Sequence, residues 1–176
     1  HCVTRRQRQM CIRDSHHVAY RCRDSEETRE FYEDFLGLTL IKAFEIKETK
    51  TGRKTSVLHT FYQMDDESCI AFFESPNQSF NFIKQHDFDL HIALEVSYET
   101  LLKMYDKGKM NNIETRGISD HGFISSVYFR DPNGYVVELA AKKETYADES
   151  KDYNQSARAA LAEWSNCLLY TSDAAD

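Results

Sequence analysis

The sequence has no apolar run long enough to span a membrane, and no signal peptide is visible in it. It also lacks an excess of positive charge, because 22 Lys and Arg residues stand against 29 Asp and Glu residues, for a net charge of −7. An acidic chain does not suit binding to a phosphate backbone. These absences argue against a membrane-spanning or nucleic-acid-binding protein and predict a cytoplasmic one.

The two ends of the chain do not read as native protein sequence. Arg5–Ser15 and Cys167–Asp176 match translations of the two opposite strands of a transposase-type sequencing adapter. We therefore expect residues 1–15 and 167–176 to be read-through of library DNA, and the fold prediction omits them. The alternative is a basic N-terminal arm that contacts nucleic acid, followed by a loose tail.

Cysteine is scarce once these ends are set aside, since only Cys22 and Cys69 are left. Both lie in apolar, strand-like contexts, which predicts buried thiols in a protein of a reducing compartment. The length of residues 16–166 suits one domain, or two small fused modules with a shared core.

Residues 16–75 and 88–142 repeat one pattern, in which a strand is followed by an amphipathic helix and three more strands. A linker at 76–87, with one helical turn around Phe80–Ile83, joins the two modules. Each module is too small to bury its own sheet face, so the fold class is α+β, with tandem βαβββ modules that share a core. The expected strands are 16–22, 38–47, 56–64, 69–73, 90–96, 113–118, 124–130 and 135–141, and the expected helices are 25–36 and 98–108.

After the second module, residues 143–166 contain a polar stretch and an expected helix at Gln155–Asn166. Ala157, Ala160, Leu161 and Trp164 form one apolar stripe along this helix. We expect the stripe to pack on the outside of the sheet or at a subunit contact, and a homodimer is therefore a possible assembly.

Three side chains are candidate metal ligands. His17 and His91 stand at equivalent places in the repeat, each at the head of a strand. Glu138 lies in an apolar run, where a carboxylate costs several kcal/mol unless a cation or hydrogen-bond donors meet it. Two imidazoles and one carboxylate form a metal centre that leaves positions open for substrate, although a single histidine in a strand is usually structural. The neighbouring His16 is expected to point away from His17.

The sequence also contains four motifs in a fixed order: His17-Val18-Ala19, Phe31-Tyr32-x-x-Phe35-Leu36-Gly37-Leu38, His91-Ile92-Ala93-Leu94-Glu95-Val96, and Tyr128-Phe129-x-Asp131-Pro132-Asn133-Gly134-x-x-x-Glu138. Together they resemble the vicinal oxygen chelate superfamily over residues 16–142. This superfamily includes glyoxalase I, ring-cleavage (extradiol) dioxygenases, fosfomycin-resistance enzymes and bleomycin-binding proteins.

The resemblance implies a curled mixed sheet around a central metal cavity, with His17, His91 and Glu138 as ligands of Fe(II) or Mn(II). A small-molecule substrate would chelate the metal through two adjacent oxygens. Tyr128 matches the position of a substrate-binding tyrosine in the ring-cleavage dioxygenases, which are therefore the favoured class. The acid/base histidine of that class has no match here, and His121 is the candidate that replaces it, with His59 as a second.

Two alternatives stay open. A glyoxalase- or epimerase-type isomerase needs a further carboxylate ligand from the first module. Aligning Cys69–Phe73 with Tyr135–Leu139 places Phe72 at the position equivalent to Glu138, and a phenylalanine cannot bind a metal. Only a slipped register would place Glu74 at the metal. The other alternative is a metal-free small-molecule binding protein that resembles the bleomycin-binding proteins.

Overall fold

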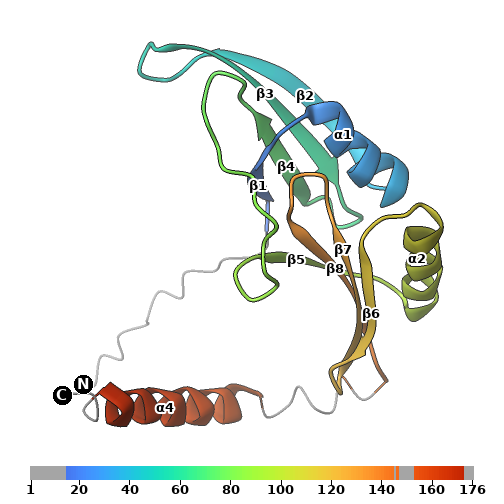
Figure 1. Ribbon diagram of the computed structural model, residues 1–176, viewed down its shortest axis with the longest axis vertical. Coiled ribbons are helices and arrows are strands. Elements are labelled where there is room, and N and C mark those ends of the chain that lie inside the picture. Colours follow the sequence, from blue (N-terminus) through green and yellow to red (C-terminus); the bar gives the residue numbers. More distant parts are fainter. Residues whose placement is uncertain (1–14, 145, 147–152, 173–176) are drawn as a thin grey trace, which may run out of the picture. The chain divides into compact units, whose positions relative to one another are not determined.

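The computed structural model describes residues 15–144, 146 and 153–172, and divides into two compact units. The first unit contains residues 1–84 together with Asp131–Gly134, and the second contains Gln85–Arg130 and Tyr135–Asp176. Each unit is built around one mixed, four-stranded sheet with few helices, which confirms the predicted fold class (Figure 1). The shared core and the central cavity stay predictions, because each unit is described by itself.

The first sheet has the strand order β1-β4-β3-β2, with β1 parallel to β4 and the other pairs antiparallel. A parallel pair needs a crossover connection, and here α1 and the wider helix η1 begin that crossover. The elements of this unit are β1 (His17–Cys22), α1 (Ser25–Arg29), η1 (Glu30–Phe35), β2 (Thr39–Glu48), β3 (Lys54–Gln63) and β4 (Cys69–Glu74).

Local sequence explains where the first helix begins and which face it buries. The Asp24 side chain accepts hydrogen bonds from the backbone N–H groups of Glu26 and Glu27, which is an N-cap. Tyr32 is fully buried against Phe72 of β4, with ring centroids 4.7 Å apart. The helix therefore covers one face of the sheet and leaves the opposite face for other roles.

The second sheet repeats this topology in the order β5-β8-β7-β6, with β5 parallel to β8. Helix α2 begins after the N-cap Ser97 and packs closely, because a Cβ on its Gly108 would lie 2.6 Å from Cε1 of Phe129. The elements of this unit are β5 (His91–Glu95), α2 (Tyr98–Met110), β6 (Thr115–Asp120), β7 (Ile124–Arg130), β8 (Val136–Lys142) and α4 (Tyr153–Ser172).

The turn between β7 and β8, Asp131–Gly134, belongs to the first unit. Asn133 Oδ1 accepts a hydrogen bond from the Arg23 backbone N–H at 2.8 Å, and Asn133 Nδ2 donates to Thr28 Oγ1 at 3.2 Å. The Tyr32 hydroxyl donates to Asp131 Oδ2 at 3.1 Å. These buried polar contacts explain why the Asp-Pro-Asn-Gly sequence is more than a surface turn.

The helical turn expected around Phe80–Ile83 is wrong, since this segment has no regular secondary structure. The guanidinium of Arg21 lies over the Phe80 ring and that of Arg23 over the Phe82 ring, at 5.5 and 5.4 Å from the centroids. The two arginines are two residues apart, and so are the two phenylalanines, which is the period of an extended chain. These cation–π contacts therefore favour an extended segment over a helical turn.

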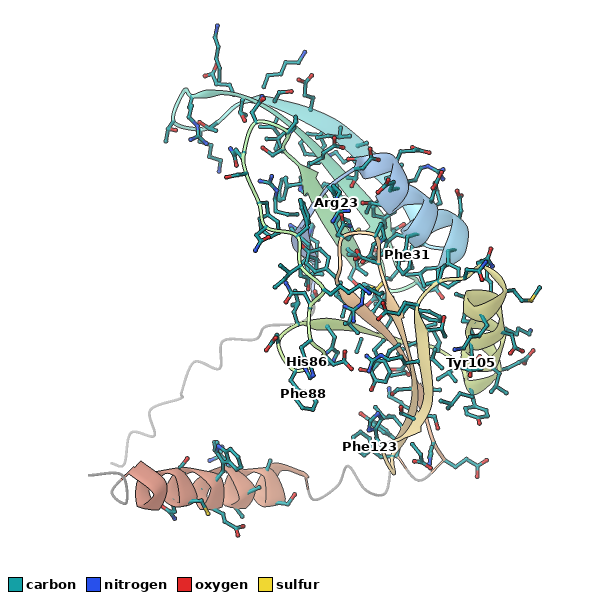
Figure 2. All side chains as sticks on the ribbon, in the orientation of Figure 1. Arg23, Phe31, His86, Phe88, Tyr105 and Phe123 are labelled. Atoms are coloured by element: carbon teal, nitrogen blue, oxygen red, sulfur yellow. The ribbon has the colours of Figure 1, made fainter. Side chains whose placement is uncertain are left out.

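The C-terminal helix differs from its expected surroundings. Leu161 and Trp164 of α4 are 67% and 65% exposed, so these two residues of the expected stripe do not pack on the sheet, and the subunit contact stays a prediction. Phe88, in the loop before β5, also projects outward and is 93% exposed (Figure 2). The expected read-through segments lie outside the described residues, except for Ser15 and the end of α4. Among the described helices, none combines the length and the apolar character of a membrane span.

Candidate functional site

The face of the second sheet opposite α2 gathers four of the predicted site residues. His91 lies at the start of β5, Tyr128 is on β7 and Glu138 is on β8, while His121 lies in the loop before β7. The Nε2 atom of His91 is 3.4 Å from Oε2 of Glu138. The Nε2 atom of His121 is 3.0 Å from the Tyr128 hydroxyl oxygen.

Strand register places these side chains together. Tyr128 lies directly opposite Glu138 in the antiparallel β7–β8 pair, so their side chains point to the same face. In the parallel β5–β8 pair Ala93 lies opposite Glu138, and His91 precedes Ala93 by two residues on the same face. The opposite face carries the apolar residues Val127, Val137 and Leu139, which are buried.

Glu138 is a carboxylate with few donors around it. Its residue is only 6% exposed, and its Oε1 accepts a hydrogen bond from the Ser126 hydroxyl at 2.5 Å. The side chain of His91 is 42% exposed, so one edge of the pair is open to solvent. Glu138 is buried, but it lies beside the exposed edge of the His91 ring. A cation or a proton that approaches along this edge can therefore bind to the carboxylate.

Burial raises the pKa of the Tyr128 phenol, and the charge of Glu138 raises it further. The phenol therefore stays protonated at neutral pH and is available as a hydrogen-bond donor. Arg116 of β6 lies over the same ring, with its Cζ atom 5.2 Å from the centroid, and forms an ion pair with Asp87. This ion pair and the phenol form a polar border on the sheet face.

The sequence prediction missed Ser126, Arg116 and Asp87. Ser126 precedes Tyr128 by two residues in a strand, so strand periodicity alone would have placed both on one face. Arg116 lies directly opposite Tyr128 in the antiparallel β6–β7 pair, and the alternation of side chains along one strand does not give this pairing between strands.

In the first unit, His17 lies on the face of the sheet opposite α1. Its ring lies at the edge of Phe61, with centroids 5.6 Å apart. The expectation that His16 points away from His17 is wrong, since their Nδ1 atoms are 2.7 Å apart. His16 precedes β1, so the alternation of side chains along a strand does not apply to it.

Register also corrects the alignment of the two modules. His17 lies opposite Cys69 and His91 lies opposite Val136, which makes Ala71, and not Phe72, the counterpart of Glu138. Phe72 is fully buried on the helix-covered face of the first sheet.

Glu74 lies on that same helix-covered face, and its Oε2 accepts a hydrogen bond from the Ser25 backbone N–H at 2.9 Å. Its carboxylate therefore stabilises the start of α1 and points away from the face that carries His17. This position argues against Glu74 as a metal ligand.

His59, the second acid/base candidate, is buried on β3 among aromatic rings. Its ring stacks on Phe73 with centroids 3.7 Å apart, and its Nδ1 is 2.9 Å from the carbonyl oxygen of Phe72. Burial lowers its pKa. These contacts are those of a structural histidine.

Within the part of the chain that the structure describes, no three His, Cys, Asp or Glu side chains gather as metal ligands. His17 belongs to the first unit, whereas His91 and Glu138 belong to the second. The three-residue metal site stays a prediction, of which the His91–Glu138 pair is observed.

The chain belongs to the Glyoxalase/Bleomycin resistance protein/Dioxygenase superfamily, because the sequence profile of that family matches residues 15–139. The predicted family resemblance is thereby confirmed. No curated protein matches the sequence.

Solved structures with a similar fold include enzymes. Glyoxalase I of Leishmania major is 16% identical, with a TM-score of 0.61, and the match covers 83% of this chain and 99% of that chain. The fosfomycin resistance protein FosX of Listeria monocytogenes is 17% identical, with a TM-score of 0.58, and the match covers 77% and 98%. A FosX mutant in complex with Mn(II) and a dihydroxypropylphosphonic acid is 18% identical, with a TM-score of 0.57 and coverage of 76% and 96%. At these identities the likeness shows the fold alone.

Proposed function

We propose that this protein is a divalent-metal-dependent enzyme whose ligands are His17, His91 and Glu138. The observation that carries the proposal is the His91–Glu138 pair, in which an imidazole nitrogen and a carboxylate oxygen lie 3.4 Å apart, with the imidazole partly exposed and the carboxylate buried. Two ligands at about 2.1 Å from one ion, in adjacent coordination positions, lie about 3 Å from each other. The separation of the pair therefore fits a shared ion.

The hydrogen bonds around His91 favour the same assignment. Its Nδ1 is 2.7 Å from the carbonyl oxygen of Asp87, so Nδ1 carries the hydrogen and donates it to that oxygen. The lone pair of Nε2 then faces the carboxylate of Glu138, and two acceptors at this distance need a cation or a proton between them. A backbone carbonyl that fixes the tautomer of a histidine is the usual support of a metal ligand.

His17 is proposed as the third ligand because it occupies the register position in the first sheet that His91 occupies in the second. Fe(II) or Mn(II) suits two imidazoles and one carboxylate with positions left for substrate. A bound ion of this kind supplies Lewis acidity and a template for adjacent substrate oxygens. The Mn(II) complex of the similar FosX structure supports this choice.

Among the activities of the family, a ring-cleavage dioxygenase acting on a small substrate with two adjacent oxygens is the one we favour. The protonated Tyr128 phenol is placed to donate a hydrogen bond to a substrate oxygen, beside Glu138. His121, 3.0 Å from that phenol, is the proposed acid/base group that would hold or move a proton at Nε2. The isomerase alternative is weakened because the Glu74 carboxylate caps α1.

The test combines metal analysis with an assay for oxygen consumption. The full chain is loaded with Fe(II) or Mn(II), freed of excess ion and analysed by mass spectrometry, and then mixed with catechol in air. We expect stoichiometric metal and uptake of oxygen. Metal retention without oxygen uptake would contradict the dioxygenase assignment and favour the isomerase. A chain that retains no metal would favour the metal-free binding protein. Size-exclusion chromatography of the same sample tests the predicted homodimer.

A further inference from the structure

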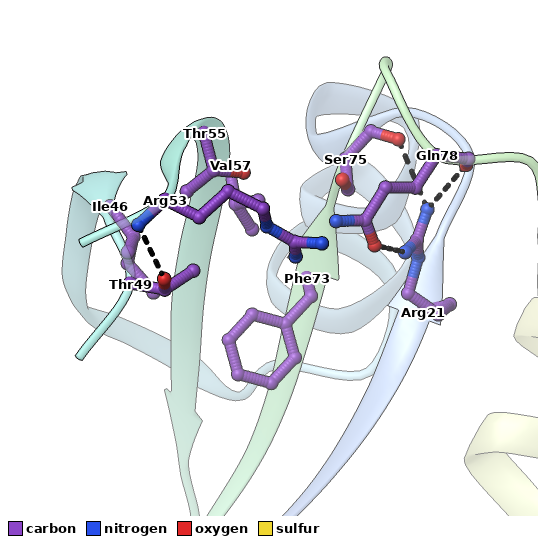
Figure 3. Close-up of a pocket in the computed structure, with 9 residues that line it drawn as sticks. All are labelled: Arg21, Ile46, Thr49, Arg53, Thr55, Val57, Phe73, Ser75 and Gln78. Carbon is purple, nitrogen blue, oxygen red and sulfur yellow. Dashed lines mark hydrogen bonds between the residues drawn. The ribbon is translucent and has the colours of Figure 1, made fainter. Parts of the chain in front are cut away.

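A cavity of about 310 Å³ lies in the first unit, on the sheet face opposite α1. It is bounded by the β2–β3 hairpin on one side and by the segment after β4 on the other (Figure 3). Two arginines, Arg21 and Arg53, line it together with hydroxyl, amide and apolar groups, and none of its nine lining residues is acidic. The lining therefore contributes two guanidinium groups and no carboxylate, which favours an anionic ligand over a cationic one.

Arg21 is held rigidly at one wall of this cavity. Its guanidinium donates to the carbonyl oxygens of Ser75 and Gln78 at 3.1 and 3.0 Å, and to the side-chain oxygen of Gln78 at 3.4 Å. It also lies over the Phe80 ring. These contacts fix the position of the guanidinium at the wall of the cavity.

Arg53 comes from the opposite wall. The turn that carries it is fixed by a hydrogen bond from the Arg53 backbone N–H to Thr49 Oγ1, at 3.2 Å. Its side chain extends across the cavity, above Phe73, towards Gln78 and Arg21 (Figure 3). Two like charges directed at one space repel each other unless an anion occupies it.

Two further features indicate what kind of anion fits. Ser75 is 5% exposed, and its hydroxyl oxygen has no hydrogen-bond partner among the described residues, so it can donate to a ligand oxygen. Phe73 and Val57 provide an apolar surface beneath the charged groups. Guanidinium groups bind carboxylates in two-point geometry, and an aromatic floor favours a flat apolar body.

We propose that this cavity binds a small organic carboxylate, with the carboxylate between Arg21 and Arg53 and its apolar body on Phe73. The proposal rests on residues of the first unit alone, and none of them is a proposed metal ligand.

The experiment is calorimetric titration of the full chain with benzoate, with benzamide as the neutral probe of equal shape. A ligand of this size is expected to bind with a Kd in roughly the millimolar range. Benzamide should bind at least about tenfold more weakly, because it cannot form the charge-assisted hydrogen bonds. Equal affinity for the two probes, or no benzoate binding, would overturn the proposal.

Two variants locate the binding. Arg53→Gln should weaken benzoate binding about tenfold, since it removes one guanidinium from an exposed turn without disturbing the core. Lys54→Gln, the matched control, removes the same charge from the same hairpin but does not line the cavity, and should leave the affinity unchanged. Equal weakening by both variants would show a general charge effect and contradict the site. A chelator should not alter benzoate affinity, whereas it would abolish an activity that depends on the proposed metal.

Discussion

In the first sheet Phe61 lies opposite Ala71, and in the second sheet Tyr128 lies opposite Glu138. These positions are equivalent by register, because His17 and His91 begin the parallel partner strands in the same way. The first module thus has an aromatic ring and a methyl group where the second has a phenol and a carboxylate. Identical strand topology carries an apolar pair at these positions in one unit and a polar pair in the other, so chemistry follows from individual side chains and not from the repeat.

The largest expected effect comes from Glu138→Gln, which removes the charge from the polar pair and leaves its shape. Metal affinity should fall by at least about 10- to 100-fold and turnover should vanish, because the amide cannot balance the charge of a divalent ion. The metal-free protein should keep its stability, since the amide can still accept from Ser126 and can donate to His91. Metal titration and urea unfolding measure the two effects.

Glu95→Gln is the matched control, because Glu95 lies on β5, its side chain is 63% exposed, and its partner is Lys142. It should change neither metal affinity nor activity. If Glu138→Gln instead destabilised the metal-free protein by several kcal/mol and left metal uptake intact, Glu138 would be a structural residue and the metal-free binding protein would be the better assignment.

The reverse exchange, Ala71→Glu, tests whether the first sheet tolerates a carboxylate at the equivalent position. Ala71 is fully buried beside Phe61, so a longer side chain there would displace packed neighbours and its charge would lose its hydration. We expect a loss of roughly 3–5 kcal/mol in the free energy of unfolding, measured in urea. Ala19→Glu, at the exposed position opposite Ala71, should change it by less than about 0.5 kcal/mol. Similar losses in both variants would mean that the face rejects charge throughout.

A third comparison concerns the turns that join the last two strands of each module. Asn133→Ala should lower the free energy of unfolding by about 2–3 kcal/mol, because it removes the partners of the Arg23 N–H and of Thr28 from a buried site. Asp66→Ala, in the corresponding turn of the first module, removes hydrogen bonds to Ser68 from an exposed side chain and should have a clearly smaller effect. Chemical denaturation of both variants checks the order, which a larger loss for Asp66→Ala would contradict.

The smallest effect is a pH dependence at His59, whose counterpart in the second sheet is Ser126. Burial lowers the pKa of His59 below its usual 6.5, so the folded state holds the neutral ring. As pH falls below 6.5 the unfolded state binds the proton first, and stability is lost. His59→Gln should flatten the curve of unfolding free energy against pH in that range, whereas the exposed His86→Gln should not. An unchanged curve for His59→Gln would contradict this assignment.

The order of strands and helices could be predicted from periodicity, because each element carries a clear signal. The start of the first helix could be predicted from Asp24 and its acidic neighbours. The starts of the two opening strands could be predicted from His17 and His91. The sequence could not supply the register between modules, since Cys69–Glu74 and Val136–Lys142 are both apolar runs that align equally well with a shift of one residue. That shift led to the choice of Phe72 in place of Ala71, and it reverses the face of every side chain.

Contacts between distant segments account for the other errors. Phe80 and Phe82 have the two-residue spacing of an extended segment, and the positions of their rings beside Arg21 and Arg23 show why the chain is extended here. Glu74 had the right charge for a ligand, but its hydrogen bond with the Ser25 N–H could not be known before the helix was placed against β4. For His91, Tyr128 and Glu138, strand alternation could predict the face of each residue within its own strand, whereas their clustering depends on the register of the β5–β8 and β7–β8 pairs.

The Asp131–Gly134 turn has a practical consequence for dissecting the molecule. A single cleavage after Lys84 would produce two polypeptides, and the shorter one would lack the groups that accept from Tyr32 and from the Arg23 N–H. The N-terminal fragment should therefore fold poorly alone and recover when a peptide containing residues 131–134 is supplied in trans. The chain repeats a module, but the compact unit of its first half is discontinuous in the sequence.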